Sequence, residues 1–163
     1  MKRTSTRHAQ QGVSMIEVLI AIVVLAVGAL GFAGVQVVAM QKSENANYRS
    51  NAMLIAQDAV ERMQANSEDI DGDGYLQGAI ELDGTPDQTC ASSCDIVDLD
   101  TQQLAWSANQ SLPNGEIMIA ECAFNGLNCV VLSWGEQDID ACMTADGINL
   151  SDDANCLVME FGR

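Results

Sequence analysis

A single carboxylate inside a long apolar run constrains this chain more than any other feature. Between Val13 and Met40 the only ionisable side chain is Glu17, and three basic residues precede the run. The 26 residues from Val13 to Val38 would span roughly 39 Å as an α-helix, enough to cross a bilayer with tilt. The basic lead-in predicts a cytoplasmic N-terminus and an exported remainder. A carboxylate near the start of such a helix is costly and normally has a partner.

The rest of the chain is strongly acidic. The formal net charge is −16, and removal of the basic lead-in leaves four basic residues against 23 acidic ones, or −19. A nucleic-acid partner is therefore not expected, because phosphate binding needs a basic face.

The six cysteines all lie beyond the apolar run, in the second half of the chain. An even number of cysteines downstream of a membrane signal indicates disulfides in an oxidising compartment. We expect three bridges rather than a zinc site, because the chain has no CxxC motif and its only histidine, His8, lies in the lead-in. The residues concerned are Cys90, Cys94, Cys122, Cys129, Cys142 and Cys156.

An acidic, glycine-rich turn follows the first helix. Asp69, Asp71 and Asp73 have the spacing that begins a calcium-binding loop. The twelfth position of such a loop is Ile80, where a bidentate glutamate is needed, and Glu81 comes one residue late. A solvated acidic loop is therefore favoured over a calcium site, and no metal or cofactor is expected.

The first helix is predicted to extend to about Gln64, because no proline interrupts it. After Met40 the sequence becomes polar with a narrow apolar stripe at helical spacing, which predicts packing against a globular head. Asp58 and Arg62 are spaced to pair as i and i+4. The stripe consists of Tyr48, Ala52, Ile55, Ala59 and Met63.

The head combines one short helix with β-strands. A helix is expected at about Thr101–Ser111, ended by Leu-Pro-Asn-Gly, and a last strand at Cys156–Phe161. Two strands, Glu116–Phe124 and Leu127–Trp134, flank Asn125-Gly126, the favoured pair of a type I′ hairpin.

A type I′ turn at Asn125-Gly126 also predicts the register of the hairpin. Cys122 would lie opposite Cys129, with Ile119 opposite Leu132 and Ile117 opposite Trp134 on the other face. A disulfide between Cys122 and Cys129 would then be within reach, leaving Cys142 and Cys156 for the C-terminal segment. The overall expectation is an α+β fold, a long N-terminal hydrophobic helix packed against a small antiparallel sheet.

The start of the apolar run, Gly-Val-Ser-Met-Ile-Glu-Val-Leu-Ile, resembles the class III signal of type IV pilins and pseudopilins. The resemblance implies that a prepilin peptidase cuts after Gly12 and that the new N-terminal residue, Val13, is N-methylated. Glu17 then matches the family's glutamate at the fifth mature position. Val13 departs from the usual phenylalanine or methionine but is also apolar.

The resemblance suggests a partner for Glu17. The ammonium group of a neighbouring subunit's N-terminus would neutralise this carboxylate during assembly, so that only one stagger between subunits relieves the burial cost. The alternative is that Glu17 extends towards the lipid headgroups.

The head is similar to PilV-type minor pilins, in which a tryptophan, a Leu-Pro-Asn-Gly turn and a second tryptophan follow the signal. Here these residues are Trp106, Leu112, Pro113, Gly115 and Trp134. The resemblance implies a minor pilin of a type IV pilus, supporting assembly and with possible roles in adhesion or twitching motility. The alternatives are a minor pseudopilin of a type II secretion system and a membrane-anchored binding domain that never assembles.

The expected organisation is a cytoplasmic leader at 1–12, a transmembrane and assembly helix at 13–64 and a disulfide-containing head at 65–163. The implied partners are prepilin peptidase, the inner membrane with its pilus assembly platform, and other major and minor pilins. The implied location is the bacterial inner membrane and then the pilus. An enzyme is not expected, because no serine or cysteine has a recognisable base partner and the acidic turn would repel phosphate.

Overall fold

The computed structural model describes residues 12–66, 74–85, 95–151 and 154–162. Its contacts divide the chain into two units, Met1–Lys42 and Ser43–Arg163, and each is described by itself. The elements are α1 (Met15–Ala65), β1 (Gly78–Ile80), α3 (Ile96–Ser111), β2 (Glu116–Glu121), β3 (Asn128–Ser133), the 3₁₀ turn η1 (Ile139–Ala141), β4 (Met143–Thr144), β5 (Gly147–Ile148) and β6 (Cys156–Phe161).

In the first unit, α1 is apolar around its whole circumference and exposed to solvent. Its best 18-residue window has a mean hydropathy of 2.8, and none of that window is buried. Within the described residues α1 is the one helix long and apolar enough to cross a membrane, by length and composition alone. Such an exposed apolar surface needs another apolar environment to cover it.

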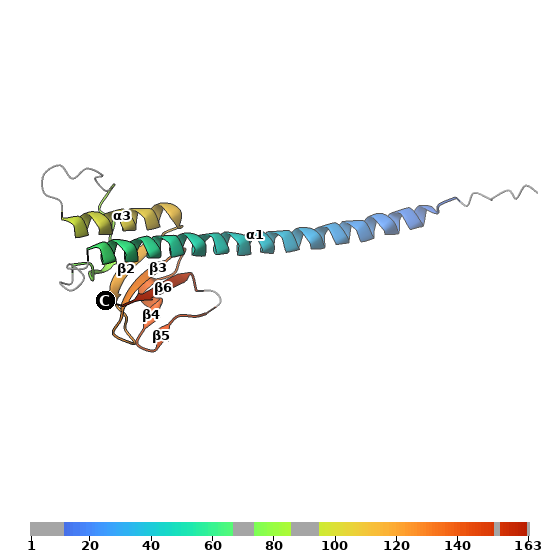
Figure 1. Ribbon diagram of the computed structural model, residues 1–163. Helices are drawn as coiled ribbons and strands as arrows, with labels where there is room; N and C mark the ends of the chain where they lie inside the picture. The colour runs from blue at the N-terminus through green and yellow to red at the C-terminus, as the bar shows by residue number, and fades with distance from the viewer. Residues whose placement is uncertain (1–11, 67–73, 86–94, 152–153, 163) are drawn as a thin grey trace, which may run out of the picture. The chain divides into compact units, whose positions relative to one another are not determined.

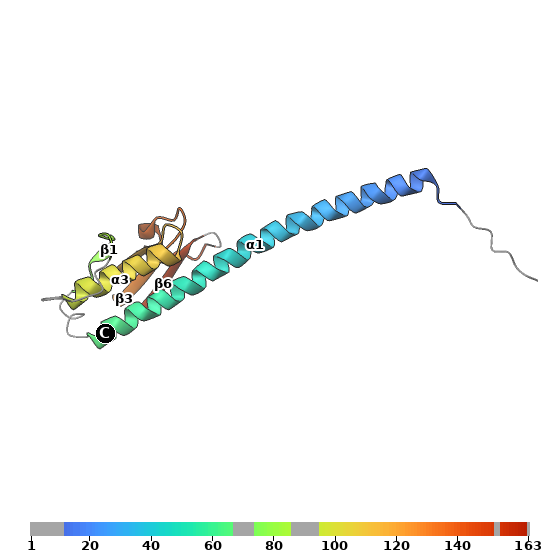
Figure 2. The same ribbon diagram turned by 90° about the horizontal axis from the view of Figure 1, so that it is seen from above.

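The second unit is built on a four-stranded antiparallel sheet with the order β1-β2-β3-β6. The C-terminal part of α1 and α3 lie side by side over one face of this sheet (Figures 1 and 2). Between the helices and the sheet lies the larger hydrophobic core, in which the predicted stripe of α1 is buried apart from Tyr48, which is partly buried. This core includes Ala52, Ile55, Ala56, Ala59, Met63, Leu104, Ala108, Ile117, Ile119, Val130, Leu132 and Trp134.

The opposite face of the sheet carries a smaller core that contains both disulfides of the described residues. Cys122 is bonded to Cys129, with their Cα atoms 5.1 Å apart, and Cys142 to Cys156, at 5.7 Å. Met118, Val131, Ile139 and Ala154 are buried around them. The sheet is therefore covered on one face by helices and on the other by η1 and the disulfide-linked segments.

Helix α3 begins five residues before the predicted Thr101, although its predicted end at Ser111 is confirmed. Asp95 caps the helix by accepting a hydrogen bond from the backbone N–H of Val97 at 3.0 Å. The hydroxyl of Thr101 donates to the carbonyl of Val97 at 2.8 Å, which satisfies a polar side chain that is buried against the core. The five added residues, Ile-Val-Asp-Leu-Asp, are mainly apolar, and the sequence prediction did not recognise the Asp95 cap that precedes them.

The predicted hairpin register is wrong by two residues. Ile117 pairs with Leu132, Ile119 with Val130, and Cys129 with Ala120. Both strands are also shorter than predicted, ending at Glu121 and beginning at Asn128.

The turn geometry explains the shift. A type I′ turn needs a positive φ at both central residues, but Gly126 has φ +71° and Asn125 has no positive φ. The Asn125 side chain instead accepts from the N–H of Leu127 at 3.0 Å, and the N–H of Gly126 donates to the carbonyl of Cys122 at 3.4 Å. A shift of two residues keeps each side chain on its face, so the disulfide still forms across the hairpin.

The predicted fold class is confirmed: a long N-terminal apolar helix packs against a four-stranded antiparallel sheet in a pilin-like α+β fold. The last strand is also confirmed at Cys156–Phe161. Strands β1, β4 and β5 were not predicted, because runs of two or three residues carry too little alternation to be recognised.

Candidate functional site

The candidate assembly site lies at the start of α1. Residues 12–14 precede the helix, and the carbonyl of Ser14 accepts hydrogen bonds from the N–H groups of Glu17 at 3.0 Å and Val18 at 3.4 Å. Glu17 thus occupies the first turn, where the positive end of the helix dipole favours a carboxylate.

Val13 and Glu17 lie on the same side of the chain. Together with Val18, Ala21, Ile22 and Leu25 they line a shallow groove of about 280 Å³. The walls of this groove are otherwise apolar, and its residues are exposed. An amino group placed at Val13 would therefore be on the same surface as the carboxylate, bordered by hydrocarbon.

Glu17 takes no part in the two ion pairs found among the described residues, which are Arg62–Asp58 and Arg62–Asp100. Within the part of the chain that the structure describes, no cation pairs with this carboxylate. Such an arrangement suits a partner supplied from outside the chain.

Three glycines on α1 could also serve helix contacts. A Cβ atom added at Gly28, Gly31 or Gly34 would meet nothing within 4 Å, so the chain's own packing does not require these glycines.

In the head, a polar network joins the end of α1 to α3. Arg62 donates to Asp58 at 3.1 Å, as its i,i+4 spacing predicted, and to Asp100 at 2.8 Å. Burial alone would lower the pKa of the Arg62 guanidinium, but its hydrogen bonds to Asp58 and Asp100 and the charges of both carboxylates outweigh burial and raise this pKa. The guanidinium therefore stays charged within the head.

The Leu-Pro-Asn-Gly turn is hydrogen-bonded to Gly135, just beyond the end of β3. The carbonyl of Pro113 accepts from the N–H of Gly135 at 2.6 Å, and the Asn114 side chain donates to the carbonyl of Gly135 at 3.2 Å. A Cβ at Gly115 would collide with the carbonyl oxygen of Ala108. This turn and the buried Trp134 therefore hold α3 to the sheet. Most of the residues that resemble PilV-type minor pilins thus have a structural role.

The remaining predicted residues divide into described and undescribed ones. Cys122, Cys129, Cys142 and Cys156 form two disulfides on the face of the sheet away from the helices. Cys90 and Cys94 lie outside the described residues, as do the calcium candidates Asp69, Asp71 and Asp73. No group of metal-binding side chains occurs among the residues that the structure describes.

Sequence reasoning missed the polar contacts that α1 makes with residues distant in the sequence. Asp100 of α3 binds Arg62, and it also accepts from the hydroxyl of Tyr75 at 2.7 Å. Arg49 donates to the carbonyl of Ala154 at 3.3 Å, and its Cζ atom lies 5.7 Å from the centre of the Trp134 ring. The Arg62–Asp100 and Arg49–Ala154 hydrogen bonds join residues that are 38 and 105 positions apart in the sequence, so only the tertiary fold brings them together.

Comparison with known proteins adds one finding at the N-terminus. Residues 7–33 match the prokaryotic N-terminal methylation motif, which spans the candidate site. No curated protein and no solved structure matches the chain. By its motif, the class III prepilin signal, and by its fold, the chain is type IV pilin-like.

Proteins of the pilin and pseudopilin class are typically structural rather than enzymatic. By family alone, the motif implies processing by a prepilin peptidase and assembly with pilins. The exposed apolar helix that carries it is consistent with residence in the inner membrane followed by incorporation into a pilus.

Proposed function

We propose that this chain is a minor pilin of a type IV pilus, related to the PilV type, and that it supports pilus assembly. The observation that carries the proposal is the methylation motif at residues 7–33, placed at the start of a helix that ends in the core of a globular head. In this proposal residues 1–12 are the leader, 13–64 the assembly helix and 65–163 the head.

The chemistry of the motif assigns a role to each residue. Cleavage after Gly12 creates an ammonium group at Val13, which is then methylated. Glu17 pairs with the ammonium group of a neighbouring subunit, which offsets the cost of placing a carboxylate among apolar helices. The minor pilin assignment is supported by the order of Trp106, the Leu112–Gly115 turn and Trp134.

Processing provides the direct test. The native chain expressed with its own secretion machinery should yield a mature form that begins with N-methylated Val13, measured by intact mass and N-terminal peptide analysis. Gly12→Glu should leave the leader attached, whereas the control Gly28→Ala should be processed normally. A native chain that keeps its leader in cells that process other prepilins would contradict the proposal.

The identity of the filament requires a second measurement. Sheared surface filaments and membrane fractions are analysed for the mature chain and the proteins that co-purify with it. Co-purification with pilus subunits supports the minor pilin assignment. Co-purification with type II secretion components would instead identify a minor pseudopilin, and a mature chain that co-purifies with neither would indicate an anchored domain that does not assemble.

A further inference from the structure

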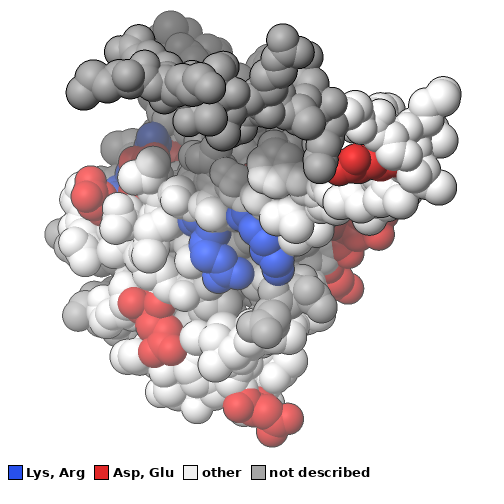
Figure 3. Space-filling view, turned by 90° about the vertical axis from the view of Figure 1, so that its right-hand side faces the viewer, with Lys and Arg blue, Asp and Glu red and all other residues white. Residues whose placement is uncertain are grey.

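Arg49 is a cation without a carboxylate partner among the described residues. The basic side chains of those residues are Lys42, Arg49 and Arg62, and Arg62 is neutralised by two aspartates. Arg49 uses one donor for the carbonyl of Ala154 and stacks against Trp134, so that most of its N–H groups remain available. Acidic side chains are spread around the face of the molecule in Figure 3, so an uncompensated arginine is unusual here.

Arg49 lies at the side of a recess of about 390 Å³ in the head. The recess is lined by Arg49, Ile148, Asn149, Leu150, Ser151, Cys156, Leu157 and Val158. Its volume is within the range of about 300–1,000 Å³ that is typical of ligand pockets.

The recess runs along the edge of the sheet. Leu157 packs against the helix-side core, whereas Cys156 and Val158 pack against the disulfide-side core. A recess lined by three consecutive strand residues therefore follows the strand edge rather than either face. Among the described strands only β3 pairs with β6, so the other edge of β6 offers backbone donors and acceptors to this recess.

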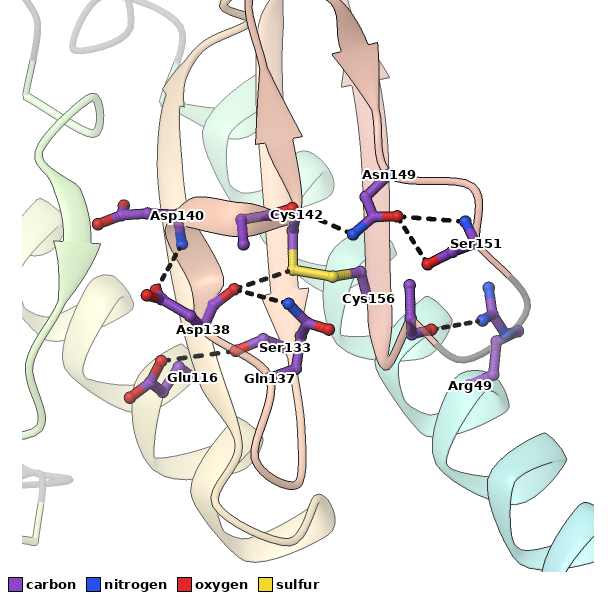
Figure 4. The surroundings of a disulfide bond; sticks show 12 residues. Arg49, Glu116, Ser133, Gln137, Asp138, Asp140, Cys142, Asn149, Ser151 and Cys156 are labelled. Carbon is purple, nitrogen blue, oxygen red and sulfur yellow. Dashed lines mark hydrogen bonds between the residues drawn. A yellow bond between two sulfur atoms is a disulfide. The ribbon is translucent and has the colours of Figure 1, made fainter.

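The outer wall of the recess, residues 148–151, is held in place on both sides. The Cys142–Cys156 disulfide ties the segment that leads into this wall to β6 (Figure 4). Asn149 donates to the carbonyl of Ala141 at 3.3 Å and accepts from the N–H and the hydroxyl of Ser151 at 3.2 and 2.8 Å. The wall is thus preorganised, which reduces the entropy lost when a ligand binds.

We propose that this recess binds an extended protein segment that pairs with the free edge of β6 and places an aspartate or glutamate side chain against Arg49. Addition of a strand to an exposed sheet edge supplies backbone hydrogen bonds. The planar guanidinium binds a carboxylate through two parallel hydrogen bonds. The six-residue β6 contains no lysine or proline to discourage such pairing. The proposal does not depend on filament assembly.

The test is a peptide titration of the full-length ¹⁵N-labelled protein in detergent micelles. The probe is acetyl-Thr-Val-Asp-Val-Thr-amide, and the comparison peptide has asparagine in place of aspartate. Amide signals of Leu150, Leu157 and Val158 should shift, and the aspartate peptide should bind about tenfold more tightly, because only its carboxylate can accept charge-assisted hydrogen bonds from the guanidinium. N-methylation of the peptide backbone at both valines should abolish binding.

Substitutions distinguish peptide binding by Arg49 from a purely structural role of this residue. Arg49→Gln should remove the preference for aspartate over asparagine. Ser151→Glu, at an exposed wall residue, should weaken binding of the aspartate peptide, whereas the matched charge at the exposed Gln110→Glu should have no effect.

Equal binding of both peptides to the native chain, or no shift at millimolar peptide, would overturn the proposal. If Arg49→Gln disrupts the whole spectrum, the comparison of Ser151→Glu with Gln110→Glu decides: equal affinity in these two variants also overturns it.

Discussion

Nη1 of Arg62 lies 2.8 Å from Oδ1 of Asp100, and this ion pair joins α1 to α3. The other oxygen of Asp100 accepts from the hydroxyl of the fully buried Tyr75, and the Asn66 side chain donates to the same hydroxyl at 3.1 Å. One carboxylate therefore connects the last turn of α1, the chain beyond residue 73 and the first half of α3.

Loss of either partner of this ion pair should destabilise the head. The Asp100 side chain is 13% exposed, so Arg62→Met would leave a largely buried carboxylate without its cation, at a cost of about 3–5 kcal/mol. Chemical denaturation of Arg62→Met, Asp100→Asn and the double variant should give a coupling energy of about 1–3 kcal/mol.

Asp58→Asn is the matched control, because the Asp58 side chain is 49% exposed and an exposed pair contributes only about 0.2–1 kcal/mol. The raised pKa of Arg62 fixes the pH dependence. The stabilisation is fully present below the ordinary arginine pKa and is lost only as the pH rises through the still higher value in the folded head. The coupling energy at pH 6 and pH 9 should therefore agree, and a fall at pH 9 would contradict this account.

Gly115→Ala should destabilise the joint between α3 and β2. The added methyl group would lie 2.7 Å from Cβ of Leu112 and even closer to the carbonyl of Ala108. Because both neighbours belong to the packed end of α3, we expect a loss of about 1–3 kcal/mol in the free energy of unfolding, measured by denaturation. Gly28→Ala, where a Cβ meets nothing within 4 Å, is the control and should leave head stability unchanged.

The two described disulfides should contribute unequally to stability. They close segments with sequence separations of 7 and 14, and the entropy removed from the unfolded chain grows with loop length. The double variant Cys142→Ala/Cys156→Ala should lose about 3 kcal/mol, and Cys122→Ala/Cys129→Ala about 2.5 kcal/mol. Denaturation of both variants against the native chain measures the difference.

Alkylation under non-reducing conditions provides the control for the disulfide variants. We expect the unfolded native chain to take up no alkylating reagent, because all six cysteines are predicted to be oxidised. Uptake of two groups, at Cys90 and Cys94, would show that the three-bridge prediction is wrong while leaving the two described disulfides intact.

Glu17→Ala should separate membrane insertion from assembly. The variant should insert at least as well as the native chain, because removal of a carboxylate from an apolar helix lowers the cost of insertion. It should be depleted from sheared filaments, because the charge that selects the stagger between subunits is gone. Quantitative mass spectrometry of membrane and filament fractions measures both, with Glu44→Ala as the control outside the apolar run. Normal levels of Glu17→Ala in filaments would contradict the proposal that the Glu17 charge selects the stagger between subunits.

Long-period features of the sequence predicted much of the fold. The apolar run and the stripe from Ala52 to Met63 repeat over many turns, so they indicate both α1 and its buried face without ambiguity. The alternation in β2 and β3 likewise placed Ile117 and Ile119 on the face opposite the cysteines, and the structure shows that this face packs against the helices. These patterns arise from residues close together in the sequence, so the predictions based on them agree with the structure.

Features set by tertiary contacts could not be predicted in the same way. The hairpin register depends on the type of turn at Asn125-Gly126. Here the Asn125 side chain accepts a hydrogen bond from the N–H of Leu127, and the type I′ turn does not form. The recess beside Arg49 needs residues separated by about a hundred positions to meet. At the N-terminus the situation is reversed, because Gly12, Val13 and Glu17 lie within one short stretch of sequence and the motif can be recognised without the tertiary fold.

The division of α1 between two units has a practical consequence for producing the head in soluble form. Every side chain of α1 that is buried lies between Ala52 and Met63, whereas the boundary between the units falls after Lys42. A chain begun at Ser43 would keep all of these core contacts and the Arg62–Asp100 ion pair. It would shed the exposed apolar segment that makes detergent necessary, so the point of truncation can be chosen from the packing alone.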